Sequence, residues 1–206
     1  MTVDFSLEKY FNDFRYKKLF KKYFKKNIFL DTFAFSLIIQ GKFDENMNYN
    51  TLIGDKNNKI FMNLRTYKKL MNLLGMHQGK LIITSSVVSE SLNHIFEAIE
   101  NKYKTDEGKK EIEEKFVDFL KSEIKLFKEK QPLIKDLLNH RWVEETKHHK
   151  IRNRIEVGDL SIFVESDKCK YNAIITKDQY KKNKDGECIK LDDTIIVQLD
   201  ILSMTQ

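Results

Sequence analysis

Two neighbouring stretches, GDLSIFVES at 158–166 and AIITKD at 173–178, decide the fold. The first predicts a helix that carries an acid, Asp159, in its first turn. The second predicts a short strand that ends close to a second acid, Asp178, because short apolar runs are typical of strands buried in parallel sheets. Together they predict a helix followed by a buried strand, with an acid at each junction.

Two further acids occupy comparable places upstream. The run NIFL at 27–30 predicts a strand that ends at Asp31, followed by a helix over 32–39 that we expect to stop near Gly41. The run LIIT at 81–84 predicts a second strand, followed by a helix to about residue 101 with Glu90 near its start. A final apolar run, TIIVQL at 194–199, predicts the last strand.

Strands that alternate with helices predict βαβ units and an α/β fold with a mainly parallel sheet of about five strands. The carboxyl ends of parallel strands lie on one edge of a sheet, and ligands bind there at the point where the strand order reverses. We therefore expect Asp31, Glu90, Asp159 and Asp178 to meet at one edge, although they are far apart in the sequence.

Crowded carboxylates repel one another unless a cation neutralises them, and carboxylate oxygens suit Mg²⁺ or Mn²⁺. Such an ion, bound beside a phosphodiester, activates water and stabilises the charge that develops on the phosphate. The four acids are therefore candidate metal ligands and catalytic groups of a nuclease.

Composition fits a globular chain with an anionic partner. The 206 residues carry 37 basic and 31 acidic side chains, a formal net charge of +6, which favours nucleic acid as the partner. No apolar run has the roughly 20 residues that a membrane span needs, and no secretory signal is evident at the N-terminus. Cys169 and Cys188 lack metal-site spacing and are expected to be free thiols in the cytoplasm.

The rest of the chain predicts further helices. Residues 5–26 and 60–75 have helical spacing of large apolar side chains, the second range with Phe61, Leu64, Leu70, Leu73 and Leu74 as expected core; 42–59 is expected to be a loop. A long helix is expected over about 107–129 and another after Pro132. The basic stretch 140–155, with Lys150, Arg152 and Arg154, is a candidate contact for phosphates, with a solvated helix face as the alternative.

Four short blocks carry the acids: FLDT at 29–32, SSVVSESL at 85–92, GDLSIFVES at 158–166 and AIITKDQY at 173–180. Together they resemble the signature blocks of the PIN-domain ribonucleases, which include the toxins of bacterial toxin–antitoxin pairs. The chain departs from the family pattern in its long N-terminal lead, in the long gap between Glu90 and Asp159, and in Phe163 and Val164, where small residues are usual.

The resemblance implies a single PIN-like domain over 1–206, built as a three-layer α/β/α sandwich. Its additions would be an N-terminal helical extension over 1–26 and a helical insertion over about 102–155. The implied activity is Mg²⁺- or Mn²⁺-dependent hydrolysis of RNA, with DNA as the alternative substrate. Thr32 and Thr176, beside the acids, become candidate nucleic-acid contacts, and an antitoxin-like protein and a second copy of the chain become candidate partners.

Other interpretations of the same residues stay open. Asp31 or Thr32 can simply cap a helix, and Glu90 can be an ordinary solvated residue. Glu156, Glu165 or Asp167 can replace Glu90 as a ligand. The whole chain can be a catalytically inactive PIN-like module that binds RNA or protein. No nucleotide-binding glycine motif occurs, and the acid pairs that haloacid dehalogenases and phospho-receiver domains need are missing around Asp31.

Overall fold

The strongest apolar runs of the chain form the centre of a parallel sheet. The computed structural model describes residues 5–6, 12, 14–47, 64–139, 157–178 and 193–199. The central strands are β2 (Asn27–Leu30) and β5 (Asn172–Thr176), which pair in parallel with Leu30 opposite Ile175. Every residue of β5 is buried, so both faces of the sheet are covered at its centre.

Within the described residues the sheet has six strands, in the order β1-β6-β5-β2-β3-β4, and every pair is parallel. The other four strands are β1 (Phe5–Ser6), β3 (Lys80–Thr84), β4 (Lys128–Lys130) and β6 (Thr194–Gln198). The strand order reverses between β2 and β5: the chain passes from β2 towards β3 and β4, then returns to β5 on the other side. The expected α/β fold with a mainly parallel sheet flanked by helices is confirmed, and every strand pair in the described residues is parallel.

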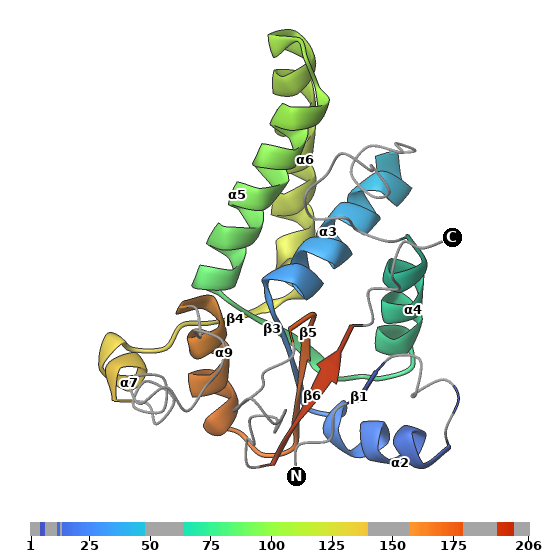
Figure 1. Cartoon of the computed structure of the whole chain (residues 1–206), viewed down its shortest axis with the longest axis vertical. Helices are drawn as coiled ribbons and strands as arrows, with labels where there is room; N and C mark the ends of the chain where they lie inside the picture. The colour runs from blue at the N-terminus through green and yellow to red at the C-terminus, as the bar shows by residue number, and fades with distance from the viewer. Residues whose placement is uncertain are drawn as a thin grey trace, which may run out of the picture.

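The helices connect and cover these strands (Figure 1). They are α2 (Phe14–Tyr23), α3 (Thr32–Met47), α4 (Leu64–Gly75), α5 (Ser85–Lys102), α6 (Asp106–Glu123), α7 (Ile134–Leu138) and α9 (Val157–Asp167), with a 3₁₀ turn at Ile124–Leu126. Figure 1 shows α5 and α6 side by side as a hairpin that extends well beyond the sheet. α9 contacts β2, β3 and β5, and α3 contacts β2, β5, α4, α5 and α6. No helix in the described ranges is long and apolar enough to cross a membrane.

Three expectations about the elements are wrong. Residues 5–6 are not part of a helix but form a strand that pairs with β6. α3 continues through Gly41 to Met47 because Phe43 packs against Phe116 and Phe119 of α6, and the lack of a side chain at Gly41 makes room for the Tyr67 ring. The helix expected over 107–129 ends at Glu123, and the last part of this range belongs to the edge strand β4.

Smaller differences concern the core and the caps. Leu64 is 47% exposed at the start of α4, whereas Tyr67, which was not expected in the core, is buried. Leu70 and Leu73 are buried as predicted. The cap of α5 is Thr84, the last residue of β3, whose hydroxyl accepts the Val87 N–H. Phe61 and Cys188 lie outside the described residues, and Cys169 is a free thiol.

Candidate active site at the carboxyl edge of the sheet

The point where the strand order reverses places two of the predicted acids side by side. Asp31 directly follows β2, and Asp178 lies two residues beyond the end of β5. The Asp31 N–H donates to the Ile175 carbonyl at 3.0 Å, which continues the ladder between the two strands as far as the acid. In α/β sheets this is the position where a crevice opens for a ligand.

An open pocket of about 240 Å³ lies at this edge. All four predicted acids line it, together with two hydroxyl side chains, one ring and two basic side chains. The lining residues are Asp31, Thr32, Phe33, Ser36, Glu90, His94, Asp159, Lys177 and Asp178. With four carboxylates against one lysine and one histidine, the lining is negative when every acid is ionised.

Asp31 is both the cap of α3 and the deepest acid of the pocket. Its Oδ1 accepts the Ala34 N–H at 2.6 Å, its Oδ2 accepts the Lys177 N–H at 3.1 Å, and it is only 3% exposed. Burial raises the pKa of Asp31 from 3.8 to about 6, although hydrogen bonds from Thr176, Ala34 and Lys177 oppose the rise, and Asp178 adds to it. A nearby cation would stabilise the charged form of this carboxylate.

Glu90 is fixed against the start of α3 and is not an ordinary solvated residue. The Thr32 hydroxyl donates to Glu90 Oε2 at 2.7 Å, and the Ser91 hydroxyl donates to the Thr32 carbonyl at 3.1 Å. Glu90 Oε1 lies 3.8 Å from His94 Nε2. Thr32, predicted as a nucleic-acid contact, therefore orients a pocket carboxylate in the structure.

The start of α9 is packed closely against Glu90, which brings Asp159 into the pocket. A Cβ atom at Gly158 would lie 2.9 Å from Glu90 Oε2, so a side chain at this position would displace the end of Glu90. The Ser161 hydroxyl donates to the Gly158 carbonyl at 2.6 Å and lies 2.7 Å from the buried hydroxyl of Thr84. These contacts hold the first turn of α9 over the end of β3.

Asp178 is at the mouth of the pocket. Its N–H donates to the Thr176 hydroxyl at 2.9 Å, and its side chain is exposed. The preceding residue, Lys177, lines the pocket and places its Nζ 5.1 Å from the centre of the Phe33 ring. Thr176 is buried and hydrogen-bonded to Asp31, so it supports the acids and is not open to a nucleic acid.

One buried hydroxyl in the pocket wall has no hydrogen-bond partner among the described residues. Ser36 is 1% exposed and lines the pocket, and its Oγ is the atom without a partner there. Buried polar groups are normally satisfied, so this hydroxyl is suited to a water or ligand within the pocket.

The donor set suits a hard divalent cation that keeps most of its water. No three acidic, histidine or cysteine side chains among the described residues are arranged to hold a metal ion as a group. Mg²⁺ usually retains several waters and binds proteins through one or two carboxylates. Carboxylate and hydroxyl oxygens are the ligands that such an ion takes, so one or two of the pocket acids could hold it directly, with the others reached through its waters.

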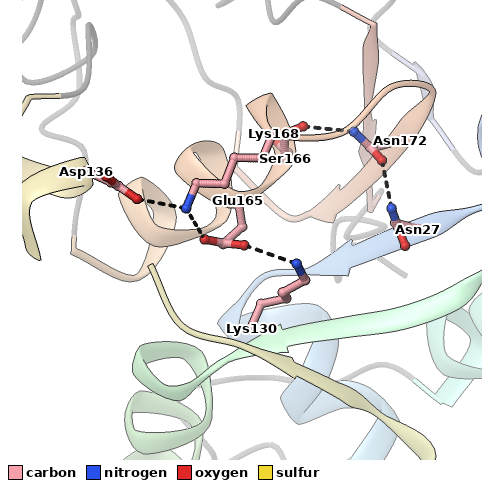
Figure 2. Close-up of polar contacts among 7 residues, drawn as sticks. All are labelled: Asn27, Lys130, Asp136, Glu165, Ser166, Lys168 and Asn172. Carbon is pink, nitrogen blue, oxygen red and sulfur yellow. Dashed lines mark hydrogen bonds and ion pairs between the residues drawn. The ribbon is translucent and has the colours of Figure 1, made fainter. Parts of the chain in front are cut away.

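The alternative ligands in α9 point elsewhere. Figure 2 shows Glu165 between two lysines, with Oε1 2.7 Å from Lys168 Nζ and Oε2 3.6 Å from Lys130 Nζ, while Lys168 also reaches Asp136 at 2.9 Å. Glu165 is thus used to join α9 to β4 and α7. Asp167 is exposed at the far end of α9, and Glu156 lies outside the described residues.

A second buried contact in Figure 2 joins α9 to the starts of the central strands. Asn172 donates to the Ser166 carbonyl at 2.9 Å and accepts from Asn27 at 3.3 Å. The opposite end of α9 from Asp159 is therefore tied to β5 and β2, which fixes the direction of the helix.

The predicted basic contacts Lys150, Arg152 and Arg154 lie in the range 140–156, outside the described residues. The sequence did not predict the supporting residues Ser36, Ser91, Gly158 and Lys177, because none of them is part of a periodic apolar pattern. Only the closeness of Gly158 to Asp159 in a helix start could have drawn attention to that residue.

The fold and the pocket define an α/β protein with an all-parallel sheet and an acidic pocket at the reversal of strand order. Comparison of the chain with protein-family models, with curated proteins and with solved structures found no match.

Proposed function

We propose that this chain is a metal-dependent nuclease, of the endoribonuclease type, whose active site is the acidic pocket. The observation that carries the proposal is that four carboxylates from four separate segments line one pocket where the strand order reverses. The resemblance to PIN-domain ribonucleases supports the same chemistry. An antitoxin-like partner and a homodimer stay predictions.

The roles of the residues follow from their environments. A bound Mg²⁺ or Mn²⁺ would supply an activated water and would stabilise the charge that develops on the phosphate. Asp31, buried and held by two backbone N–H groups, is a fixed ligand; Asp178, exposed at the mouth, is the ligand that also meets substrate. Lys177 provides the positive charge in the pocket lining that attracts a phosphate.

Glu90 and Asp159 complete the charge of the pocket. Thr32 orients the Glu90 carboxylate, and Gly158 allows Asp159 to approach it. With Asp31 and Asp178, these two carboxylates surround the ion with acidic groups, either as direct ligands or through its waters.

Cleavage of a labelled single-stranded RNA in Mg²⁺ or Mn²⁺ tests the proposal. We expect Asp178→Asn and Asp159→Asn to reduce the rate by about 100-fold or more, because loss of groups that bind or orient a metal costs at least 10–100-fold. Asp118→Asn, which removes an exposed acid on α6, is the matched control and should cleave like the unaltered protein. Chelation with EDTA should stop cleavage.

Two outcomes would contradict the proposal. Equal cleavage by the pocket variants and the control would place the activity elsewhere. RNA binding without any cleavage by the unaltered protein in either metal would favour the inactive binding module.

A further inference from the structure

The excess positive charge of the chain is concentrated in one short segment. Residues 14–26 contain seven basic side chains, Arg15 and six lysines, and no acid. The whole chain has a net charge of +6, so all other residues together have 30 basic and 31 acidic side chains and a net charge of −1. The lysines are Lys17, Lys18, Lys21, Lys22, Lys25 and Lys26, here called the α2 lysine surface.

All six lysines are exposed and lie on α2 or directly after it. None of them forms an ion pair with an acid in the described ranges, whereas the lysines of α6 pair with acids three or four residues away. The lysines of α2 are themselves four residues apart, as in Lys17 and Lys21 or Lys18 and Lys22. Like charges at this spacing destabilise a helix, so this surface is costly unless an anion covers it.

The opposite face of α2 is already used in the core. Phe20, Tyr23 and Phe24 are buried, and the rings of Phe20 and Phe24 stack with their centres 4.7 Å apart. A helix that lies in a membrane surface needs a free apolar face, and this face of α2 is not free. The lysines therefore suit a polyanion in water rather than a lipid surface.

An exposed aromatic ring lies next to these charges. Phe14 is 81% exposed and precedes Lys17 and Lys18 by one helical turn. Proteins that bind single-stranded nucleic acids combine a basic surface for the phosphates with aromatic side chains on which bases stack. Lysines beside an exposed ring provide both parts of such a surface.

The α2 lysine surface is separate from the acidic pocket. α2 leads into the start of β2, whereas Asp31 follows its end, and Figure 1 shows α2 at the end of the sheet opposite the α5–α6 hairpin. A strand of four residues spans about 13 Å, so one extended nucleic acid can contact both places. Lys22 and Lys26 also lie over the ring of Tyr171, 4.2 and 5.7 Å from its centre, which joins this surface to the start of β5.

We propose that the α2 lysine surface and Phe14 form a binding site for single-stranded nucleic acid, separate from the acidic pocket. The lysines contact successive phosphates, and Phe14 stacks on a base. This site goes beyond the proposed nuclease activity and does not depend on it, since phosphate binding by lysines needs neither a metal nor the pocket acids.

The test is the salt dependence of binding, measured by fluorescence anisotropy in EDTA with a labelled polyuridine RNA of about 20 nucleotides. The variant carries Lys17→Gln, Lys18→Gln, Lys21→Gln and Lys25→Gln, which spares the lysines that contact Tyr171. For single strands the slope of log affinity against log salt changes by about 0.7 for each phosphate contact, so the slope should fall in magnitude by about 3.

The matched control removes the same charge from α6 through Lys109→Gln, Lys110→Gln, Lys115→Gln and Lys121→Gln. Because these lysines are paired with acids, the slope should stay as in the unaltered protein. Phe14→Ala should weaken binding by at least about 5-fold without a change of slope. A thermal melt of the α2 variant should show no loss of stability, because like-charge repulsion is removed.

Three results would overturn the proposal. They are an unchanged slope in the folded α2 variant, equal losses in the α2 and α6 variants, and binding of the unaltered protein to phosphatidylserine vesicles but not to RNA. Failure of the nuclease proposal is distinguishable, because binding in EDTA does not require cleavage: a protein that binds RNA through the α2 lysines but cleaves none in Mg²⁺ or Mn²⁺ would contradict only the nuclease proposal.

Discussion

Asp31 shows how one residue can serve the fold and the site together. Its oxygens accept the N–H groups of Ala34 and Lys177, which is what a helix cap and a strand end require. The same contacts fix the carboxylate at the base of the pocket, where burial raises its pKa to about 6. The sequence left open whether Asp31 caps a helix or lines a site. In the structure the same carboxylate does both.

The raised pKa of Asp31 gives a prediction for stability in the absence of metal. Asp31 has a pKa of about 6 in the folded protein and 3.8 in the unfolded chain, so folding favours its protonated form. The protonated side chain therefore stabilises the fold fully below pH 3.8, and this stabilisation is lost as the pH rises through about 6. Between these limits the unaltered protein should lose about 3 kcal/mol of unfolding free energy relative to Asp31→Asn. Urea denaturation in EDTA at several pH values measures the difference between the two.

Only the pH dependence of that difference is informative. Asparagine places an amide N–H₂ against the Lys177 N–H, which adds a cost that is the same at every pH. Parallel stability curves for the two proteins would show that Asp31 is not buried as an acid of raised pKa.

Gly158→Ala tests the close approach of α9 to Glu90. The added Cβ would lie 2.9 Å from Glu90 Oε2, so we expect the carboxylate to move from Thr32 and RNA cleavage to fall by about 10-fold or more. Gly75→Ala is the control, since a Cβ there meets nothing within 4 Å. Full activity of Gly158→Ala would mean that the position of Glu90 is unimportant.

At the scale of elements, apolar runs predicted the strands β2, β3, β5 and β6 because these strands are buried. The edge strand β4 has the sequence Lys128-Glu129-Lys130, with no apolar residue, so its charged side chains concealed it within an expected helix. β1 is two residues long and pairs only with β6, a partner about 190 residues later in the chain. Pairing between distant segments leaves no periodic signal in the sequence.

The continuation of α3 beyond Gly41 depends on a contact between helices. The Tyr67 ring of α4 occupies the space of the missing side chain, and a Cβ at Gly41 would lie 2.3 Å from its Cε2 atom. Gly41→Ala should therefore lower the unfolding free energy by about 1–3 kcal/mol, although alanine favours helices. Denaturant unfolding beside Gly75→Ala provides the comparison, and stabilisation of the Gly41 variant would exclude this packing.

In the whole molecule, the order of the strands determines which acids meet in the pocket. Asp31 and Asp178 are far apart in the sequence but follow neighbouring strands. The first turns of the helices that carry Glu90 and Asp159 lie at the same edge of the sheet. The sequence predicted this convergence because each acid follows a strand or starts a helix. It could not predict that Thr32, Ser91 and Gly158 orient the acids, since such contacts depend on the packing of α3, α5 and α9.

We propose above all that the pocket carboxylates bind a divalent cation. Anomalous diffraction from crystals of the protein soaked in Mn²⁺ tests this proposal. If it is correct, a manganese peak lies in the pocket between the carboxylates of Asp31 and Asp178, and crystals of Asp178→Asn show no such peak. A pocket without manganese in the unaltered protein, with Asp31 bound only to the N–H groups of Ala34 and Lys177, would contradict it.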